Sequence, residues 1–264
     1  MKDPIAPIAA LVVLGMAVGA YYFWIRTEQE ATPPPVLPPK TAPVAEAPTP
    51  TSPPAPEIRY PIQSSPPEKP LPQLAESETP IQEVLTALID KEQLKRFNLD
   101  TPVRRFVVTV DELSRASVPQ KYDAAKPVPG KFLTLGADAD LAIDPRNYRR
   151  YAPYVSLIEA IDTKRLSAIY VRFYPLLQEE YRNIGSQKKY FNDRVVETID
   201  NLLAAPELDA SPKLAQPKVF YVFADPKIEE LSAGQKIMIR MGSENAARIK
   251  AKLREIRAEI TAVR

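Results

Sequence analysis

The sequence has neither cysteine nor histidine among its 264 residues. Without cysteine the chain forms no disulfide and offers no thiolate, either as a nucleophile or as a metal ligand. Without histidine it lacks the commonest general base, the commonest metal ligand and the only side chain that titrates near neutral pH without perturbation. An enzyme would have to work with carboxylates, lysine, tyrosine or serine, which makes catalysis the least favoured class of function.

Glycines are few, and the net charge is small. The 35 Lys and Arg residues nearly balance the 33 Asp and Glu residues, and the formal charge of +2 is too small to indicate a nucleic acid partner. None of the seven glycines lies in a phosphate loop of the form G-x-x-x-x-G-K-[ST], and we expect no cofactor. The stretch 231–235 is similar to the signature loop of ABC-type ATPases. We interpret it as a helix start, with Ser232 as its cap and Gly234 at a position of close packing.

Residues 5–25 form an apolar run without a charged side chain. As a helix with a rise of about 1.5 Å per residue the run is long enough to cross the hydrocarbon core of a bilayer. Tyr21, Tyr22 and Trp24 lie near its end, where aromatic residues meet the membrane interface. A cleaved signal peptide is the alternative, but the run is longer than the apolar core of such peptides. We therefore predict a short tail over residues 1–4 and a single-pass transmembrane anchor over residues 5–25.

Residues 26–76 are rich in proline, alanine, threonine and serine, and most of the 30 prolines lie before residue 81. This composition lacks periodic apolar residues to bury, so we predict a disordered, Pro-rich linker. In the polyproline II conformation such a spacer reaches on the order of 100 Å. An anchor, a stiff spacer and a distal domain are the usual layout of a bacterial envelope protein. We therefore expect an inner-membrane protein with a cytoplasmic N-terminus and a periplasmic C-terminal domain.

The folded domain is predicted to cover residues 77–264 and to be mainly α (α+β). Apolar residues at helical spacing predict helices that begin at Thr79-Pro80 and then occupy residues 91–97, 102–113, 145–161, 163–182, 187–204, a stretch from 226, and 244–263. The run Val107-Val-Thr-Val110 is typical of a strand, but the spacing of the whole segment favours a helix. Strands are expected at 132–135 and 141–143, as a hairpin, and at 219–223, as a buried strand.

Tyrosine and arginine are concentrated between residues 147 and 203, a stretch that holds more than half of the 12 tyrosines. These residue types carry interface hot spots, and aromatic faces also stack on sugars. The alternative is that the tyrosines are half-buried core residues and that the arginines are solvated or paired. The candidate binding residues here are Tyr148, Arg149, Arg150, Tyr151, Tyr154, Arg172, Tyr174 and Arg182.

Asn192, Asp193 and Arg194 place three polar side chains directly after Phe191, which we expect in the core. One interpretation is a buried hydrogen-bond network that fixes helix packing. The other is the floor of a ligand cleft. Both stay open, and the three polar residues are added to the candidate binding residues.

Local structure explains two further motifs. The stretch Ser186-Gln-Lys-Lys189 matches the S-x-x-K nucleophile motif of penicillin-binding enzymes, but the companion S-D-N and K-T-G motifs are absent, so a helix cap is the better interpretation. Asp138, Asp140 and Asp144 form a carboxylate group, but alanine and isoleucine stand at ligand positions of a calcium loop. We interpret these acids as turn and cap residues and expect no metal site.

Several long blocks of the chain carry a resemblance: LPQLAESE (71–78), RRFVVTVDEL (104–113), NYRRYAPYV (147–155), YPLLQEEYRNIG (174–185), YFNDRVVETIDNLL (190–203) and FADPKIEELSAGQKIMIRMGSENAARIKAKLREIR (223–257). With these blocks the chain resembles a family of proteobacterial proteins catalogued as a domain of unknown function, DUF3014. The resemblance covers about residues 70–260. It implies a Gram-negative inner-membrane location with the domain in the periplasm, and it implies no activity, catalytic residue or cofactor.

Together these observations predict a membrane-anchored envelope protein whose periplasmic domain is a non-catalytic interaction or structural module. Its partner would be an envelope protein or the cell wall. A small-ligand or glycan-binding domain that uses the same aromatic residues is the alternative. A hydrolase without histidine or cysteine, with Asp193 or Glu180 as its acid or base, is the least favoured.

Overall fold

The computed structural model describes residues 57–62, 70–187 and 189–262. The predicted anchor over residues 5–25 and most of the predicted linker lie outside these ranges. Among the helices in the described part of the chain, none combines the length and the apolar character that crossing a bilayer requires.

The domain is mainly helical, as predicted, and has two small antiparallel β pairs. Its helices are α2 (Glu78–Leu88), α3 (Lys91–Leu94), α4 (Pro102–Leu113), α5 (Ala152–Ala160), α6 (Thr163–Asn183), α7 (Phe191–Leu203), α8 (Pro226–Glu229), α9 (Ala233–Arg240) and α10 (Ser243–Ala262), and its 3-10 turns are η1 (Leu74–Glu76), η2 (Gln120–Tyr122), η3 (Asp138–Asp140) and η4 (Pro145–Arg150).

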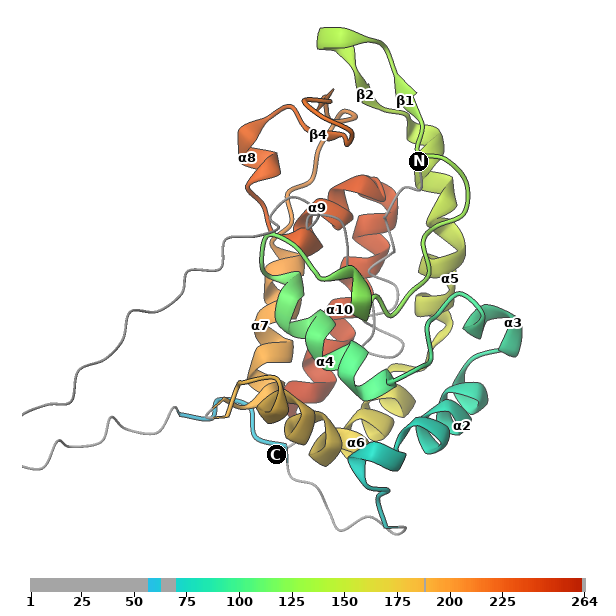
Figure 1. Cartoon of the computed structure of the whole chain (residues 1–264), viewed down its shortest axis with the longest axis vertical. Coiled ribbons are helices and arrows are strands. Elements are labelled where there is room, and N and C mark those ends of the chain that lie inside the picture. Colours follow the sequence, from blue (N-terminus) through green and yellow to red (C-terminus); the bar gives the residue numbers. More distant parts are fainter. Residues whose placement is uncertain (1–56, 63–69, 188, 263–264) are drawn as a thin grey trace, which may run out of the picture.

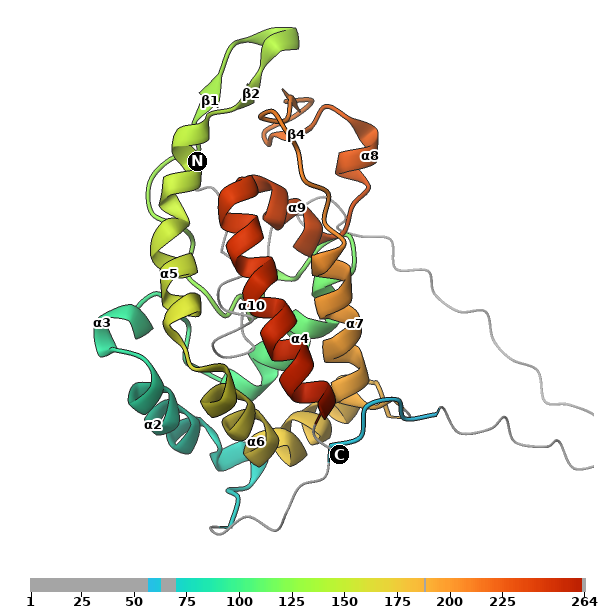
Figure 2. The same cartoon turned by 180° about the vertical axis from the view of Figure 1, so that it is seen from behind.

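The long helices form one bundle (Figure 1, Figure 2). Helix α7 packs against both α4 and α10, α5 lies along α10, and α6 closes one end of the bundle against α4, α7 and α10. The sequence of α10 shows why it sits in the centre. Ala246, Ile249, Leu253 and Ile260 recur at helical spacing, and all of them are buried.

Helix α4 confirms the choice of helix over strand for the run of β-branched residues. Every residue from Phe106 to Leu113 is buried except Glu112, so the helix is covered on most sides. Burial of this extent outweighs the strand propensity of valine and threonine, because packing energy exceeds propensity differences. The helix starts after Thr101, which has a φ of 46°, with Pro102 in the first turn.

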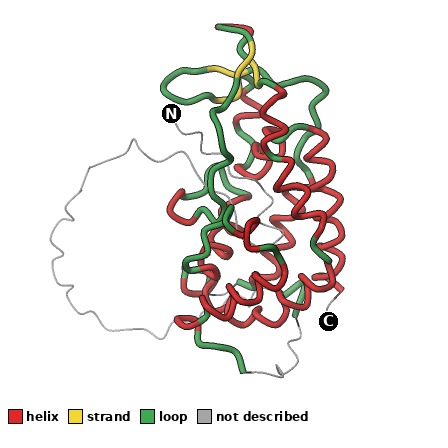
Figure 3. The backbone as a smooth tube through the Cα atoms, turned by 90° about the vertical axis from the view of Figure 1, so that its right-hand side faces the viewer, coloured by secondary structure: helices red, strands yellow, loops and turns green. Residues whose placement is uncertain are grey.

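The two β pairs lie at the end of the bundle opposite α6 (Figure 1, Figure 3). Strand β1 (Thr134–Leu135) pairs with β2 (Ala142–Ile143), which confirms the predicted hairpin. Strand β3 (Leu214–Ala215) pairs with β4 (Val222–Phe223). A hydrogen bond of 2.7 Å from the amide of Leu214 to the carbonyl of Leu141 joins the two pairs.

The predicted buried strand over 219–223 is wrong for its first half. Val219 and Phe220 are 56% and 38% exposed, because they lie in the connection between β3 and β4 and not in either strand. Only Val222 and Phe223 pair, and Phe223 is buried.

Several predicted helix boundaries are also corrected. Helix α2 begins at Glu78, after Ser77, and not at Thr79-Pro80. The segment from Pro145 is a 3-10 turn, η4, before α5 starts at Ala152. Helix α7 starts at 191 and not at 187, because the side chain of Gln178 on α6 accepts the first amide of α7, that of Phe191, at 2.8 Å. Such a cap from another helix has no signature in the local sequence.

The interpretation of the stretch 231–235 as a helix start is confirmed. Ser232 and Gln235 form a reciprocal capping box at the start of α9. Gly234 lies so close to α7 that an added Cβ would be 2.4 Å from Leu202 Cδ2. The glycine is therefore required for the contact between α7 and α9.

Candidate functional site

Residues 57–62, near the end of the predicted linker, bind to the first turn of α7, and we call them the strap. The carboxylate of Asp193 accepts the amide of Arg59 at 3.1 Å and the amide of Tyr60 at 2.8 Å. Consecutive amides that point at one anion form a concave anion-binding arrangement. The negative charge of Asp193 also lies in the first turn of α7, where the helix dipole favours it.

Two other residues at the start of α7 bind the main chain of the strap. Asn192 Nδ2 donates to the carbonyl of Tyr60 at 2.9 Å, and the hydroxyl of Tyr190 accepts the amide of Ile62 at 2.6 Å. Pro61, between them, has no amide to donate. We call Tyr190, Asn192 and Asp193, together with Glu197, which pairs with Arg59 of the strap, the strap site.

Asn192 is the buried centre of this arrangement, with no exposed surface. Its Oδ1 accepts from the Tyr170 hydroxyl at 3.0 Å, and its Nδ2 donates to the carbonyl of Ile260 at 3.2 Å as well as to the strap. The main-chain amide of Asn192 donates to the Tyr174 hydroxyl at 3.1 Å. One side chain therefore connects α6, α7, the end of α10 and the strap, and the polar residues after Phe191 form the hydrogen-bond network that one of the two interpretations predicted.

Aromatic rings surround the network. Tyr174 contacts Tyr170 edge-on at 5.7 Å between ring centroids and Tyr190 at 5.4 Å. Burial raises the pKa of both Tyr170 and Tyr174 above the usual tyrosine value, so both hydroxyls stay protonated and keep their hydrogen bonds. The Ile62 side chain of the strap is only 8% exposed and belongs to the same core cluster.

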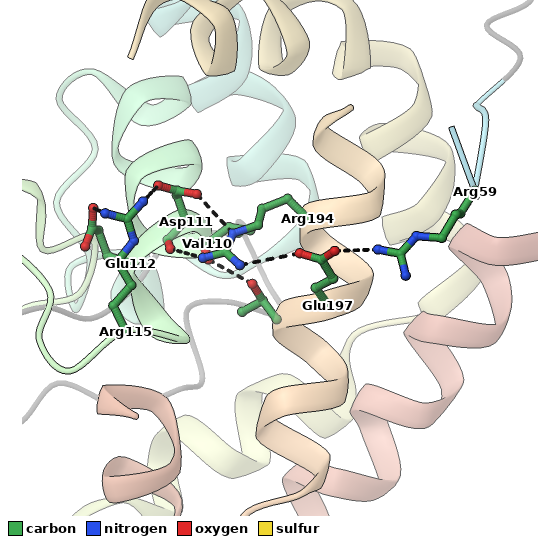
Figure 4. Close-up of polar contacts among 8 residues, drawn as sticks. Arg59, Val110, Asp111, Glu112, Arg115, Arg194 and Glu197 are labelled. Atoms are coloured by element: carbon green, nitrogen blue, oxygen red, sulfur yellow. Dashed lines mark hydrogen bonds and ion pairs between the residues drawn. The ribbon is translucent and has the colours of Figure 1, made fainter. Parts of the chain in front are cut away.

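A row of charged side chains runs from the strap to α4 (Figure 4). Arg59 of the strap pairs with Glu197, and Glu197 lies 3.5 Å from Arg194. Arg194 Nε donates to Asp111 at 3.0 Å, and Arg115 binds the other carboxylate oxygen of Asp111 at 2.6 Å. The outer pair is about half exposed and adds little stability, whereas the Asp111–Arg194 pair is mostly buried, so that removing one partner would leave the other charge poorly compensated.

The structure distributes the predicted binding residues over two ends of the molecule. Tyr148 and Arg149 lie in η4, next to the β pairs, whereas Arg172 and Arg182 lie on α6 at the opposite end (Figure 1). The exposed members are Arg149, Arg172 and Arg182, the half-buried ones are Tyr148, Arg150, Asp193 and Arg194, and the buried ones are Tyr151, Tyr154, Tyr174 and Asn192. They therefore do not form one continuous surface, and binding at the exposed members stays a prediction.

Two of these residues hold the η4 region together. The guanidinium of Arg150 donates to the carbonyls of residues 128, 129 and 130, at 2.8 to 3.2 Å. The Tyr148 hydroxyl is 3.1 Å from that of Ser211, and its ring packs so closely on Gly242 that an added Cβ would be 2.7 Å away. Both side chains therefore make contacts within the domain that stabilise its fold.

The buried carboxylates are paired with arginines. Glu180, a predicted acid or base, is 5% exposed and lies 2.9 Å from Arg104 Nη1. Asp144 caps η4, and the hydrogen bonds from the side chain and the amide of Arg146 lower the pKa of its carboxyl. In the described residues no three acidic side chains gather as a metal site.

The strap lies within residues 26–76, which the composition predicts to be one disordered linker, so its binding to α7 is not predicted from the sequence. A signal was present. Ile58, Tyr60 and Ile62 place three bulky apolar residues within five positions, in a stretch that is rich in proline and small residues. Their spacing alone does not show what they contact, because the strap site comes from residues more than a hundred positions away.

Comparison with known proteins gives one match. A family model described as "Protein of unknown function (DUF3014)" matches residues 102–257, which contain most of the bundle and the whole of α7. Neither the curated proteins nor the solved structures contain a significant match to the chain.

Proposed function

The chain belongs to the DUF3014 family, and because membership brings no activity with it, we propose a function from the geometry: a membrane-anchored envelope protein whose periplasmic domain is a non-catalytic, peptide-binding interaction module. The observation that carries the proposal is the strap site. Asp193, Asn192 and Tyr190 converge on the main chain of a short peptide segment. Main-chain recognition combined with a few side-chain contacts is how protein modules bind peptides.

The chemistry around the site supports binding over catalysis. The carboxylates nearest to it, those of Asp193 and Glu197, hold the strap, and Asp111 is bound by two arginines. Tyr151, Tyr154 and Tyr174, which a glycan-binding cleft would need at its surface, are packed in the core. These features favour a peptide partner over a sugar and over a substrate to be hydrolysed.

The envelope location comes from the sequence. An apolar run over residues 5–25 and a Pro-rich spacer would place the domain away from the inner membrane, on its periplasmic side. The strap would be the point where the spacer joins the domain, so that pulling on the anchor acts on α7 through the strap.

In-cell photo-crosslinking of the full-length protein tests the proposal. One variant carries the photo-reactive residue at Lys189, exposed beside Tyr190, and the matched control carries it at Arg149, exposed near the β pairs. We expect one reproducible envelope protein from Lys189 and not from Arg149, together with degradation of the domain by protease in spheroplasts. A folded, abundant protein that captures nothing at Lys189, or a domain that stays protected in spheroplasts, would contradict the proposal.

A further inference from the structure

The strap is bound mainly through its main chain. The amides of Arg59, Tyr60 and Ile62 and the carbonyl of Tyr60 all have partners in the strap site, at 2.6 to 3.1 Å. Groups of this kind are present in every copy of the same peptide. The contacts therefore do not depend on the strap belonging to the same molecule as the site.

The side chains of the strap define a short pattern. Arg59 pairs with Glu197, Tyr60 packs against the core, and Ile62 is buried. Ile58 is 50% exposed and the proline at position 61 is exposed, so both are covered less by the domain than Ile62 is. The site thus fits a segment in which a basic residue, an aromatic residue, a proline and a branched aliphatic residue follow one another. Its hydrogen-bond acceptors face the amides of the first, second and fourth of these residues, and the proline has no amide.

We propose that the strap site also binds the strap of a second copy of this chain, so that two copies associate by exchanging straps. The strap itself is the sequence that the site fits, which makes a second copy the partner that reproduces every contact. In the sequence only residues 63–69 connect the strap to the rest of the domain, and exchange of an identical element between copies is an inexpensive route to association.

This inference rests on the proposed peptide-binding function, and it adds the identity of the peptide. The strap of the same molecule has a high effective concentration at the site, because a short segment tethers it there. If copies are anchored in one membrane, the concentration of straps from other copies also rises, and they compete better for the site. The bound strap of an isolated copy then acts as an internal competitor of exchange.

The test uses two complementary full-length variants in detergent. The donor carries Asp193→Ala, which disables its own site, and Ile58→Cys for a fluorescent label, which is unique because the chain has no cysteine. The receiver keeps its site but carries Tyr60→Ala and Ile62→Asp, which disable its strap. Circular dichroism and urea unfolding first verify that both variants are folded.

We expect the fluorescence anisotropy of the donor to rise and saturate as the receiver is added. A matched receiver that also carries Asp193→Ala should bind roughly a hundredfold more weakly or not at all, because two charge-assisted hydrogen bonds are lost. A free peptide of residues 57–62 should compete, and the same peptide N-methylated at the Tyr60 amide should not.

Two results would overturn the proposal. Unchanged anisotropy at all receiver concentrations would mean that the site holds the strap only within one molecule. Equal binding by the receiver with Asp193→Ala, or equal competition by the N-methylated peptide, would mean that association does not use the strap site. Because the assay contains only purified copies of this chain, its failure is separate from a failure to capture an envelope partner in cells.

Discussion

Replacing Asn192 by alanine should destabilise the whole domain, because this one side chain joins four segments of the chain. The variant loses the hydrogen bond from the Tyr170 hydroxyl and those to the carbonyls of Tyr60 and Ile260. It leaves the main-chain amide of residue 192, and hence its bond to Tyr174, in place.

The magnitude follows from the burial of these groups. Each hydrogen bond contributes about 1 kcal/mol net, so three lost bonds cost about 3 kcal/mol. The variant also removes the Asn192 partner of the Tyr170 hydroxyl and of the Ile260 carbonyl, and position 192 is fully buried. The loss of these partners adds about 1 kcal/mol or more to the cost. We expect the free energy of unfolding to fall by about 3–5 kcal/mol, a large share of the stability of a typical domain.

Urea unfolding followed by far-ultraviolet circular dichroism measures the change. Asn183→Ala is the matched control, because Asn183 is exposed at the end of α6, and its effect should stay within about 0.5 kcal/mol. Asn192→Asp has the same shape and keeps an acceptor for Tyr170, but it points a carboxylate at two carbonyl oxygens. It should be at least as destabilising as alanine at neutral pH. A loss below about 1 kcal/mol for Asn192→Ala would refute the view that Asn192 holds the four segments together.

Three further outcomes are expected. Gly234→Ala should lower the free energy of unfolding by about 1–3 kcal/mol in urea, because the new methyl group would overlap Leu202 Cδ2, and unchanged stability would show that α7 and α9 separate easily. Arg194→Met should cost about 2–4 kcal/mol by leaving Asp111 with only Arg115, and additive effects in a double-mutant cycle with Asp111→Asn would contradict the coupling. Burial raises the pKa of Tyr174, so the stability that its neutral form contributes is complete below the unfolded value of about 10 and is lost as the pH rises above it. Ultraviolet absorbance of tyrosinate measures this, and titration of all tyrosines near pH 10 in the folded protein would contradict it.

The helices could be predicted where burial follows a helical period within one segment. Helix α10 presents Ile249, Leu253 and Ile260 to the core, and α4 buries Val103, Phe106 and Val110, so both helices agree with the prediction. The strand expected at 219–223 failed, because an apolar run does not reveal whether another segment covers it. Val219 and Phe220 stay 56% and 38% exposed.

The candidate site was predictable only in part. The polar residues after Phe191 stood out as a network or a cleft floor, since three polar side chains beside a core aromatic need partners. Their partners could not be predicted from the sequence, because Tyr170, Ile260 and the strap come from three distant segments. The tyrosines and arginines were located in the right stretch, but whether each faces the core or solvent depends on how the helices pack.

The helical class of the domain, the hairpin at 132–143, the cap at Ser232 and the family could all be predicted without the structure, because each depends on residues that are neighbours along the chain. The binding of the end of the Pro-rich stretch to α7, through Asn192 and Asp193, follows from the packing of the helices and not from the local sequence. Hydrogen bonds between residues about 130 positions apart form only after the helices have brought them together. Their energies depend on the burial that the same packing creates.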